Sequence, residues 1–140
     1  MSVSGSISFQ TANIDSLVFN KITKALLLYG WSFDDEDKIS YMVGDFDWEN
    51  SGLSEIDAVM EKISHNIDKD LAAGITLLWQ DSGIGGSFLF MDQERVSFST
   101  IVRPLLLNES NVIDFSWYLE KLAPIFGIIY CERVICTHEY

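Results

Sequence analysis

The chain has 140 residues, of which 48% are hydrophobic and 13% aromatic, so it can bury the core of one folded domain and is not a disordered chain. Its 9 basic and 21 acidic residues give a net charge of −12. That charge excludes a protein whose main task is to grip nucleic acid or an anionic membrane, because both tasks need Lys and Arg. We therefore expect a single globular domain over residues 1–140.

The N-terminal quarter of the chain predicts a strand and then a helix. Residues 3–10 alternate apolar side chains with serines, which indicates a half-buried strand. Apolar residues then recur at helical spacing from Ile14 to Tyr29. Asn13 is the expected N-cap of this helix, and Gly30 is the expected stop signal.

A second strand and a second helix are predicted next. Residues 38–43 alternate between apolar and polar side chains, and Gly44 ends the pattern. Residues 53–67 carry a narrow apolar stripe with steps of three or four, which is typical of a helix with one buried face. Ser54 with Asp57 resembles a capping box at the start of this helix.

The second half of the chain predicts a meander of strands, a third helix and a closing strand. Residues 75–80, 86–91 and 95–102 are strand candidates separated by turn-like segments. Asp114 can cap the third helix, Pro124 ends or kinks it, and residues 128–137 form the closing strand. The order β-α-β-α-β-β-β-α-β predicts an α+β fold, with three helices packed on a largely antiparallel sheet of about six strands.

The acidic residues are concentrated in one segment. Residues 34–70 contain twelve acids and three bases, a net charge of −9, whereas residues 1–33 have a net charge of +1. Two readings are open: a solvated face that keeps the protein soluble, or a surface that binds a basic partner. Aromatic rings within the acidic loops favour the second reading, because Trp and Tyr are enriched in interface hot spots.

We expect these acidic loops to be the partner-binding surface. Trp31 and Tyr41 lie close to regular elements and are expected to fold back onto the core, whereas Trp48 is the best candidate for an exposed ring. The loops flank the short strand 38–43 at its opposite ends, which six residues at about 3.3 Å each place about 20 Å apart. The predicted partner-binding residues are Asp34, Asp35, Asp37, Asp45, Asp47, Trp48 and Glu49.

The sequence contains no motif that fixes a chemical reaction, so we expect no catalytic residue and no cofactor. Asp45, Asp47 and Glu49 alternate as in a calcium loop, but Asn50 and Ile56 occupy the positions where an EF-hand needs Gly and Glu. The Gly-rich segment 81–86 precedes strand residues and lacks a Walker lysine, which favours a hairpin turn over a phosphate loop. The two histidines belong to no recognisable triad.

Cysteine content and hydropathy indicate a reduced, cytoplasmic protein. Cys131 and Cys136 are the only cysteines, and their spacing places them on opposite faces of a strand, so we expect no bridge between them. Cys136 and His138 share a face, but two ligands do not make a metal site. No run approaches the roughly 18 apolar residues of a membrane span, and the first residues lack the pattern of a signal peptide.

Five segments between about residues 30 and 125 stand out together: Gly30–Asp35, Ile39–Tyr41, Leu78–Asp81, Gly85–Phe90 and Trp117–Lys121. They resemble small acidic immunity proteins of bacterial contact-dependent inhibition and other polymorphic toxin systems. The resemblance implies a cytoplasmic, non-enzymatic inhibitor that binds one cognate toxin domain, often a nuclease, and it transfers no catalytic residue. The bottom-up alternatives are an enzymatic or small-molecule-binding domain with a pocket between sheet and helices, and an adaptor that uses its sheet edge.

Overall fold

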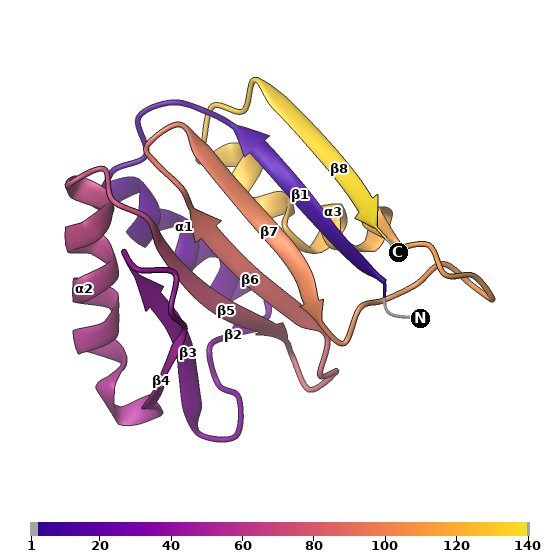
Figure 1. Cartoon of the computed structure of the whole chain (residues 1–140), viewed down its shortest axis with the longest axis horizontal. Helices are drawn as coiled ribbons and strands as arrows, with labels where there is room; N and C mark the ends of the chain where they lie inside the picture. The colour runs from indigo at the N-terminus through magenta and orange to yellow at the C-terminus, as the bar shows by residue number, and fades with distance from the viewer. Residues whose placement is uncertain (1–2, 140) are drawn as a thin grey trace.

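The computed structural model describes residues 3–139, which form one antiparallel sheet with the helices packed behind it (Figure 1). The strands are β1 (Ser4–Gln10), β2 (Trp31–Ser32), β3 (Lys38–Val43), β4 (Glu49–Gly52), β5 (Ala73–Trp79), β6 (Gly85–Phe90), β7 (Arg95–Val102) and β8 (Arg133–Glu139). The helices are α1 (Ser16–Tyr29), α2 (Ile56–Asp68) and α3 (Phe115–Lys121), with 3-10 turns η1 (Leu53–Glu55) and η2 (Ala123–Gly127).

The strands follow the spatial order β4-β3-β5-β6-β7-β1-β8, and β2 pairs with β5. The predicted α+β class and antiparallel sheet are confirmed, but the sheet has eight strands instead of about six. The two additional strands are β2 and β4, which are only two and four residues long. Sequences that short, and in β4 without any β-branched or aromatic residue, give no strand signal.

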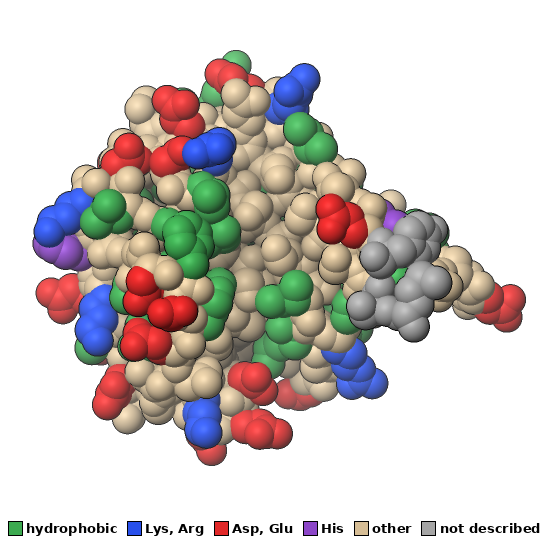
Figure 2. Space-filling model, viewed as in Figure 1, with side chains coloured by type: hydrophobic (Ala, Val, Ile, Leu, Met, Phe, Trp, Pro, Cys, Tyr) green, Lys and Arg blue, Asp and Glu red, His purple; other side chains and the backbone are tan. Residues whose placement is uncertain are grey.

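The alternation along the strands separates a core face from an open face. In β1, Ile7 and Phe9 are buried under the helices while Ser8 is exposed on the other side. In β7, Phe98 is buried while Ser97 is only half-buried. The open face of the sheet, which faces the reader in Figures 1 and 2, therefore carries many small polar side chains across its centre.

The start of α1 differs from the prediction. Asn13 is not the N-cap: it has a φ of 57° and lies in the turn before the helix. The cap is Asp15, whose carboxylate accepts a hydrogen bond from the Val18 N–H at 2.9 Å. Burial of the Ile14 side chain leaves Asp15 as the first residue free to face the open helix end. Gly30, with a φ of 137°, ends the helix as predicted.

The start of α2 also differs from the prediction, because Ser54 and Asp57 form no capping box. Ser54 lies inside η1, and Glu55 occupies the N-cap position without a side-chain hydrogen bond. The 3-10 turn leads directly into the helix, so backbone bonds replace the cap. At the start of α3, by contrast, Asp114 caps as predicted and accepts from the Trp117 N–H.

The closing strand begins later than predicted. β8 starts at Arg133, where pairing with Gln10 of β1 becomes available, and not at Ile128. The apolar segment before it continues from η2, and Ile129 is buried there. Cys131 therefore lies outside the strand, and both cysteines are free. Among the described residues, no helix is long and apolar enough to cross a membrane.

Candidate partner-binding surface

The first acidic loop is a tight two-residue turn between β2 and β3. Asp35 and Lys38 exchange both backbone hydrogen bonds, at 3.0 and 3.1 Å, so Glu36 and Asp37 form the tip. Both tip residues have positive φ, 53° and 64°, which is the conformation that normally selects Asn-Gly in a hairpin. Two carboxylates therefore occupy positions that uncharged residues would fill with less strain.

The second acidic loop joins β3 to β4 and carries two exposed rings. The Asp45 carboxylate accepts from the Asp47 N–H at 3.0 Å, which fixes the turn around Phe46. Phe46 and Trp48 are 55% and 41% exposed. The Trp48 indole lies on the open face over Gly74 of β5, where an added Cβ atom would come within 2.7 Å of the ring.

The expected division between buried and exposed rings is confirmed. Trp31 and Tyr41 are buried, and Trp48 is exposed. The seven predicted partner-binding residues are all exposed. One of them is misplaced in the prediction: Glu49 is the first residue of β4, opposite Tyr41, and not part of a loop.

One hollow on the open face connects the two loops, although they lie at opposite ends of β3. It has a volume of about 310 Å³. Across its floor the Thr76 and Ser87 hydroxyls are hydrogen bonded at 2.9 Å, joining β5 to β6. Asp35 from the first loop and Trp48 from the second both line it. The remaining lining residues are Ser40, Asn50, Thr76, Ser87, Ile101 and Val102.

Among residues 3–139, no ion pair involves the carboxylates of the two acidic loops. The ion pairs found there are Arg95–Asp92 and Lys121–Glu120. In Figure 2, most of the acidic side chains lie on the side of the view that holds β3, β4 and α2. Such a surface attracts a cationic partner over a distance of about one Debye length, roughly 8 Å in physiological salt.

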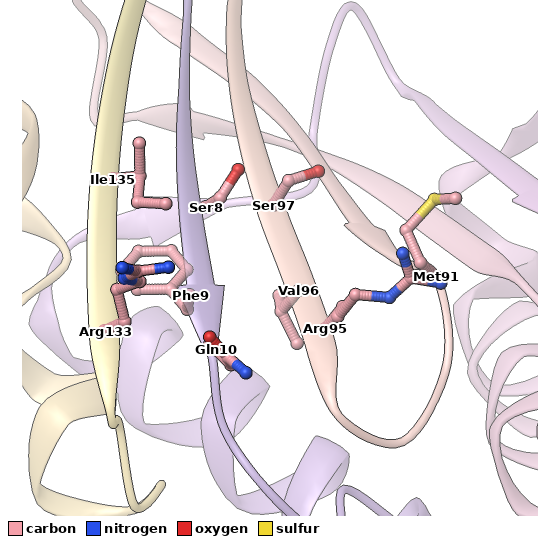
Figure 3. A pocket seen from close by; sticks show the side chains of 9 residues that line it. All are labelled: Ser8, Phe9, Gln10, Met91, Arg95, Val96, Ser97, Arg133 and Ile135. Carbon is pink, nitrogen blue, oxygen red and sulfur yellow. The ribbon is translucent and has the colours of Figure 1, made fainter.

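A second hollow on the open face, of about 380 Å³, lies over β8, β1 and β7 (Figure 3). Arg133 and Arg95 enter it from the strands on either side of β1, and Gln10 of β1 lies opposite both of them. Arg95 extends toward Met91, away from Arg133, and is paired with Asp92 at 2.7 Å. The two guanidinium groups do not converge, so this hollow is not an anion clamp.

In the described part of the chain, neither a metal-ligand cluster nor a helix-opening phosphate loop is present. No group of three His, Cys, Asp or Glu side chains there is placed to hold a metal ion. The Gly-rich segment is the hairpin turn between β5 and β6, as predicted. Core side chains such as Phe19, Phe88 and Phe98 pack between the sheet and the helices.

Sequence reasoning missed the part of the surface that the sheet contributes. Ser40, Thr76 and Ser87 belong to three different strands and meet only through the pairing of β3, β5 and β6. Glu36 was also missed, although it forms the tip of the first acidic loop. The available signal was the row of serines alternating with buried residues in β1 and β7, which marks a sheet face without helices.

Comparisons of the chain with protein-family models, with curated proteins and with solved structures gave no match.

Proposed function

We propose that this protein is an immunity protein that binds and neutralises a cognate toxin domain through the two acidic loops and the hollow between them. The observation that carries the proposal is the set of exposed carboxylates, which form no ion pair within residues 3–139, on either side of the exposed Trp48 ring. Interface anchors are commonly Trp side chains surrounded by polar residues, and complementary charge raises the rate of association.

The toxin domain would be basic on the side that faces this surface. Nucleases fit this requirement, because enzymes that act on nucleic acid carry Lys and Arg to hold the phosphates. An acidic inhibitor that covers such a surface competes directly with the polyanionic substrate. Fast capture also matters for an inhibitor of a toxin, and opposite charge accelerates capture by a factor of about 10 to 1,000.

The protein would act without chemistry of its own. Its two histidines lie apart, His65 on α2 and His138 on β8, where the Nδ1 atom of His138 accepts a hydrogen bond from the Ile113 N–H at 3.4 Å. Purified protein should show no hydrolase, transferase or nuclease turnover. Reproducible turnover that one point substitution in a hollow abolishes would contradict this part of the proposal.

The direct test is co-expression with the toxin-bearing reading frame expected immediately upstream of the gene. The two proteins should co-purify, and the toxin should be inactive in the complex. Both rate constants are then measured for Asp45→Asn/Asp47→Asn, which keeps the turn but removes two charges, and for Trp48→Ala. The charge variant should slow association most strongly at low salt, and Trp48→Ala should weaken binding about 30-fold or more.

Matched controls come from other parts of the surface. Asp81→Asn/Glu109→Gln removes two exposed charges outside the loops, and Tyr130→Ala removes an exposed ring near the other edge of the sheet. These variants should bind like the wild type. If Asp45→Asn/Asp47→Asn and Trp48→Ala also bind like the wild type, the acidic segment is only a solvated face.

A further inference from the structure

The two edges of the sheet differ in how they are protected. β4, at one edge, is four residues long and reads Glu-Asn-Ser-Gly. β8, at the other edge, is seven residues long and has no proline. It also exposes Val134, Ile135 and Cys136. Natural sheets normally block their edges with short strands, charges or prolines, because unpaired N–H and C=O groups recruit another strand. Of the two edges, the one formed by β8 is therefore less protected against pairing with a further strand, because its charged residues Arg133 and Glu139 lie only at its ends.

β8 is complementary to itself when a second copy runs antiparallel to it. A two-fold axis perpendicular to the sheet keeps the open faces of both copies on the same side. Each residue must therefore pair with a residue whose side chain lies on the same face of the sheet. With the axis at Cys136, all seven residues of the strand find an opposing residue. The resulting pairs are Arg133 with the partner's Glu139, Val134 with the partner's His138, Ile135 with the partner's Thr137, and Cys136 with the partner's Cys136.

The charged ends of β8 have opposite signs, and neither of them opposes a charged residue of β1. Gln10 opposes Arg133 in β1, and Ser4 opposes Glu139. Antiparallel self-pairing would therefore create two Arg–Glu pairs on the open face, and opposite charges directly across two strands are favourable. A strand that only had to remain solvated would not need opposite charges at its two ends.

Most of the negative charge of the chain lies away from this edge, because residues 34–70 carry −9 of the net −12. The acidic loops border β3 and β4, and the strand order places β4 six strand spacings from β8, about 29 Å at 4.8 Å each. That distance exceeds three Debye lengths in physiological salt. Residues 128–139 themselves contain two acids and one base.

Apolar surface is available beneath the strand pair. Val134 opposes Phe9 in the register of β1 and β8, so its side chain lies on the helix side of the sheet. Phe126 packs edge-on against Phe9 there, with ring centroids 5.6 Å apart, and remains 37% exposed. A second copy would cover part of both side chains.

We propose that two copies of this chain associate through antiparallel pairing of their β8 strands about a two-fold axis at Cys136. The sheets of the two protomers then join into one, and the acidic loops lie at its two far ends. This inference is independent of the proposed toxin partner, because it uses the opposite edge of the sheet.

Charge reversal tests the pairing. The mass in solution should approach twice 15.9 kDa as the concentration rises from micromolar to millimolar. Arg133→Glu alone or Glu139→Arg alone places like charges opposite each other and should raise the dimer Kd about tenfold or more. An equimolar mixture of the two variants restores both Arg–Glu pairs, so it should form heterodimers with a Kd near that of the wild type. Circular dichroism checks that each variant is folded.

The position of the axis is tested by cross-linking. In a Cys131→Ser background, a short bismaleimide should join Cys136 to the partner's Cys136 in the dimer, but not in Arg133→Glu alone. If the chain stays monomeric at all concentrations, the proposal is overturned, and the β8 edge would instead be available for pairing with a strand of a different protein. The proposal is also overturned by a dimer that Arg133→Glu leaves unchanged, a mixture that fails to restore binding, or a dimer that does not cross-link at Cys136.

Discussion

The Trp48 indole rests on Gly74, and an added Cβ atom at Gly74 would lie 2.7 Å from the ring. The same atom would lie 2.9 Å from the Phe88 carbonyl oxygen in β6. The contact holds the second acidic loop against the open face of the sheet and sets the direction in which the ring is exposed. It therefore connects the stability of the sheet with the shape of the candidate surface.

Gly74→Ala should destabilise the protein by about 1–3 kcal/mol, because the extra methyl group overpacks the site. Part of that cost comes from the ring, so it should be smaller in a Trp48→Ala background. A double-mutant cycle by urea denaturation measures the difference. Gly52→Ala is the control, since the nearest atom to its added Cβ is 3.8 Å away. Equal costs of Gly74→Ala in both backgrounds would contradict the packing of Trp48 on Gly74.

Glu36→Asn/Asp37→Gly should stabilise the fold by about 1–2 kcal/mol. Both positions have positive φ, which costs L-residues roughly 1 kcal/mol each, and Asn-Gly is the preferred pair for such a hairpin. The same change removes two charges from the candidate surface, so association with a basic partner should slow. Urea denaturation and stopped-flow association measure the two effects.

Glu36→Gln separates charge from strain at the same turn. It removes one charge but retains a side chain for which positive φ is unfavourable. The free energy of unfolding should therefore stay near the wild-type value, while association with a basic partner slows. If Glu36→Asn/Asp37→Gly binds a basic partner as fast as the wild type, the first acidic loop is not part of the interface.

Tyr118 should make the fold sensitive to alkaline pH. Burial raises the pKa of the Tyr118 hydroxyl, while the hydrogen bond from the Leu105 N–H at 2.9 Å partly opposes the shift. Above about pH 10 the unfolded chain ionises this tyrosine whereas the folded chain keeps the proton. The folded state then binds more protons, so the free energy of unfolding falls as the pH rises through this range.

Tyr118→Phe checks the assignment. At neutral pH it should cost about 1 kcal/mol or more, because the Leu105 N–H loses its acceptor. Its stability should then fall less steeply than that of the wild type between about pH 9 and about pH 11. Urea denaturation across this range gives both curves, and parallel curves would show that Tyr118 is not the group responsible.

Regular periodicity made most of the fold predictable. The strand at 38–43 and the strand at 95–102 have the predicted bounds, because alternating burial dominates their sequences. Asp114 caps α3 as predicted, whereas Asp15 and not the predicted Asn13 caps α1, although both are residue types that commonly cap helices. Residue type alone does not decide which of several neighbouring Asn, Asp or Ser residues will cap a helix.

The candidate surface was only half predictable. Exposed acids and Trp48 can be read from composition and from the lack of a repeating pattern in residues 44–49. The contribution of the sheet could not be read, because Thr76 and Ser87 meet through the register of β5 and β6. Register depends on the packing of both strands over the core, and no local stretch of sequence encodes it.

Trp31→Phe should destabilise the protein by about 2 kcal/mol or more. Trp31 is 2% exposed, and its indole N–H donates to the Lys121 carbonyl at the end of α3 at 2.8 Å. Phe keeps an aromatic ring but leaves that carbonyl without its donor and leaves space beside Trp79. Trp79→Phe is the matched control, because this half-buried ring contacts Trp31 without holding the carbonyl, and it should cost less. If both variants lower the free energy of unfolding by the same amount, the contact between β2 and α3 depends on ring volume and not on the hydrogen bond.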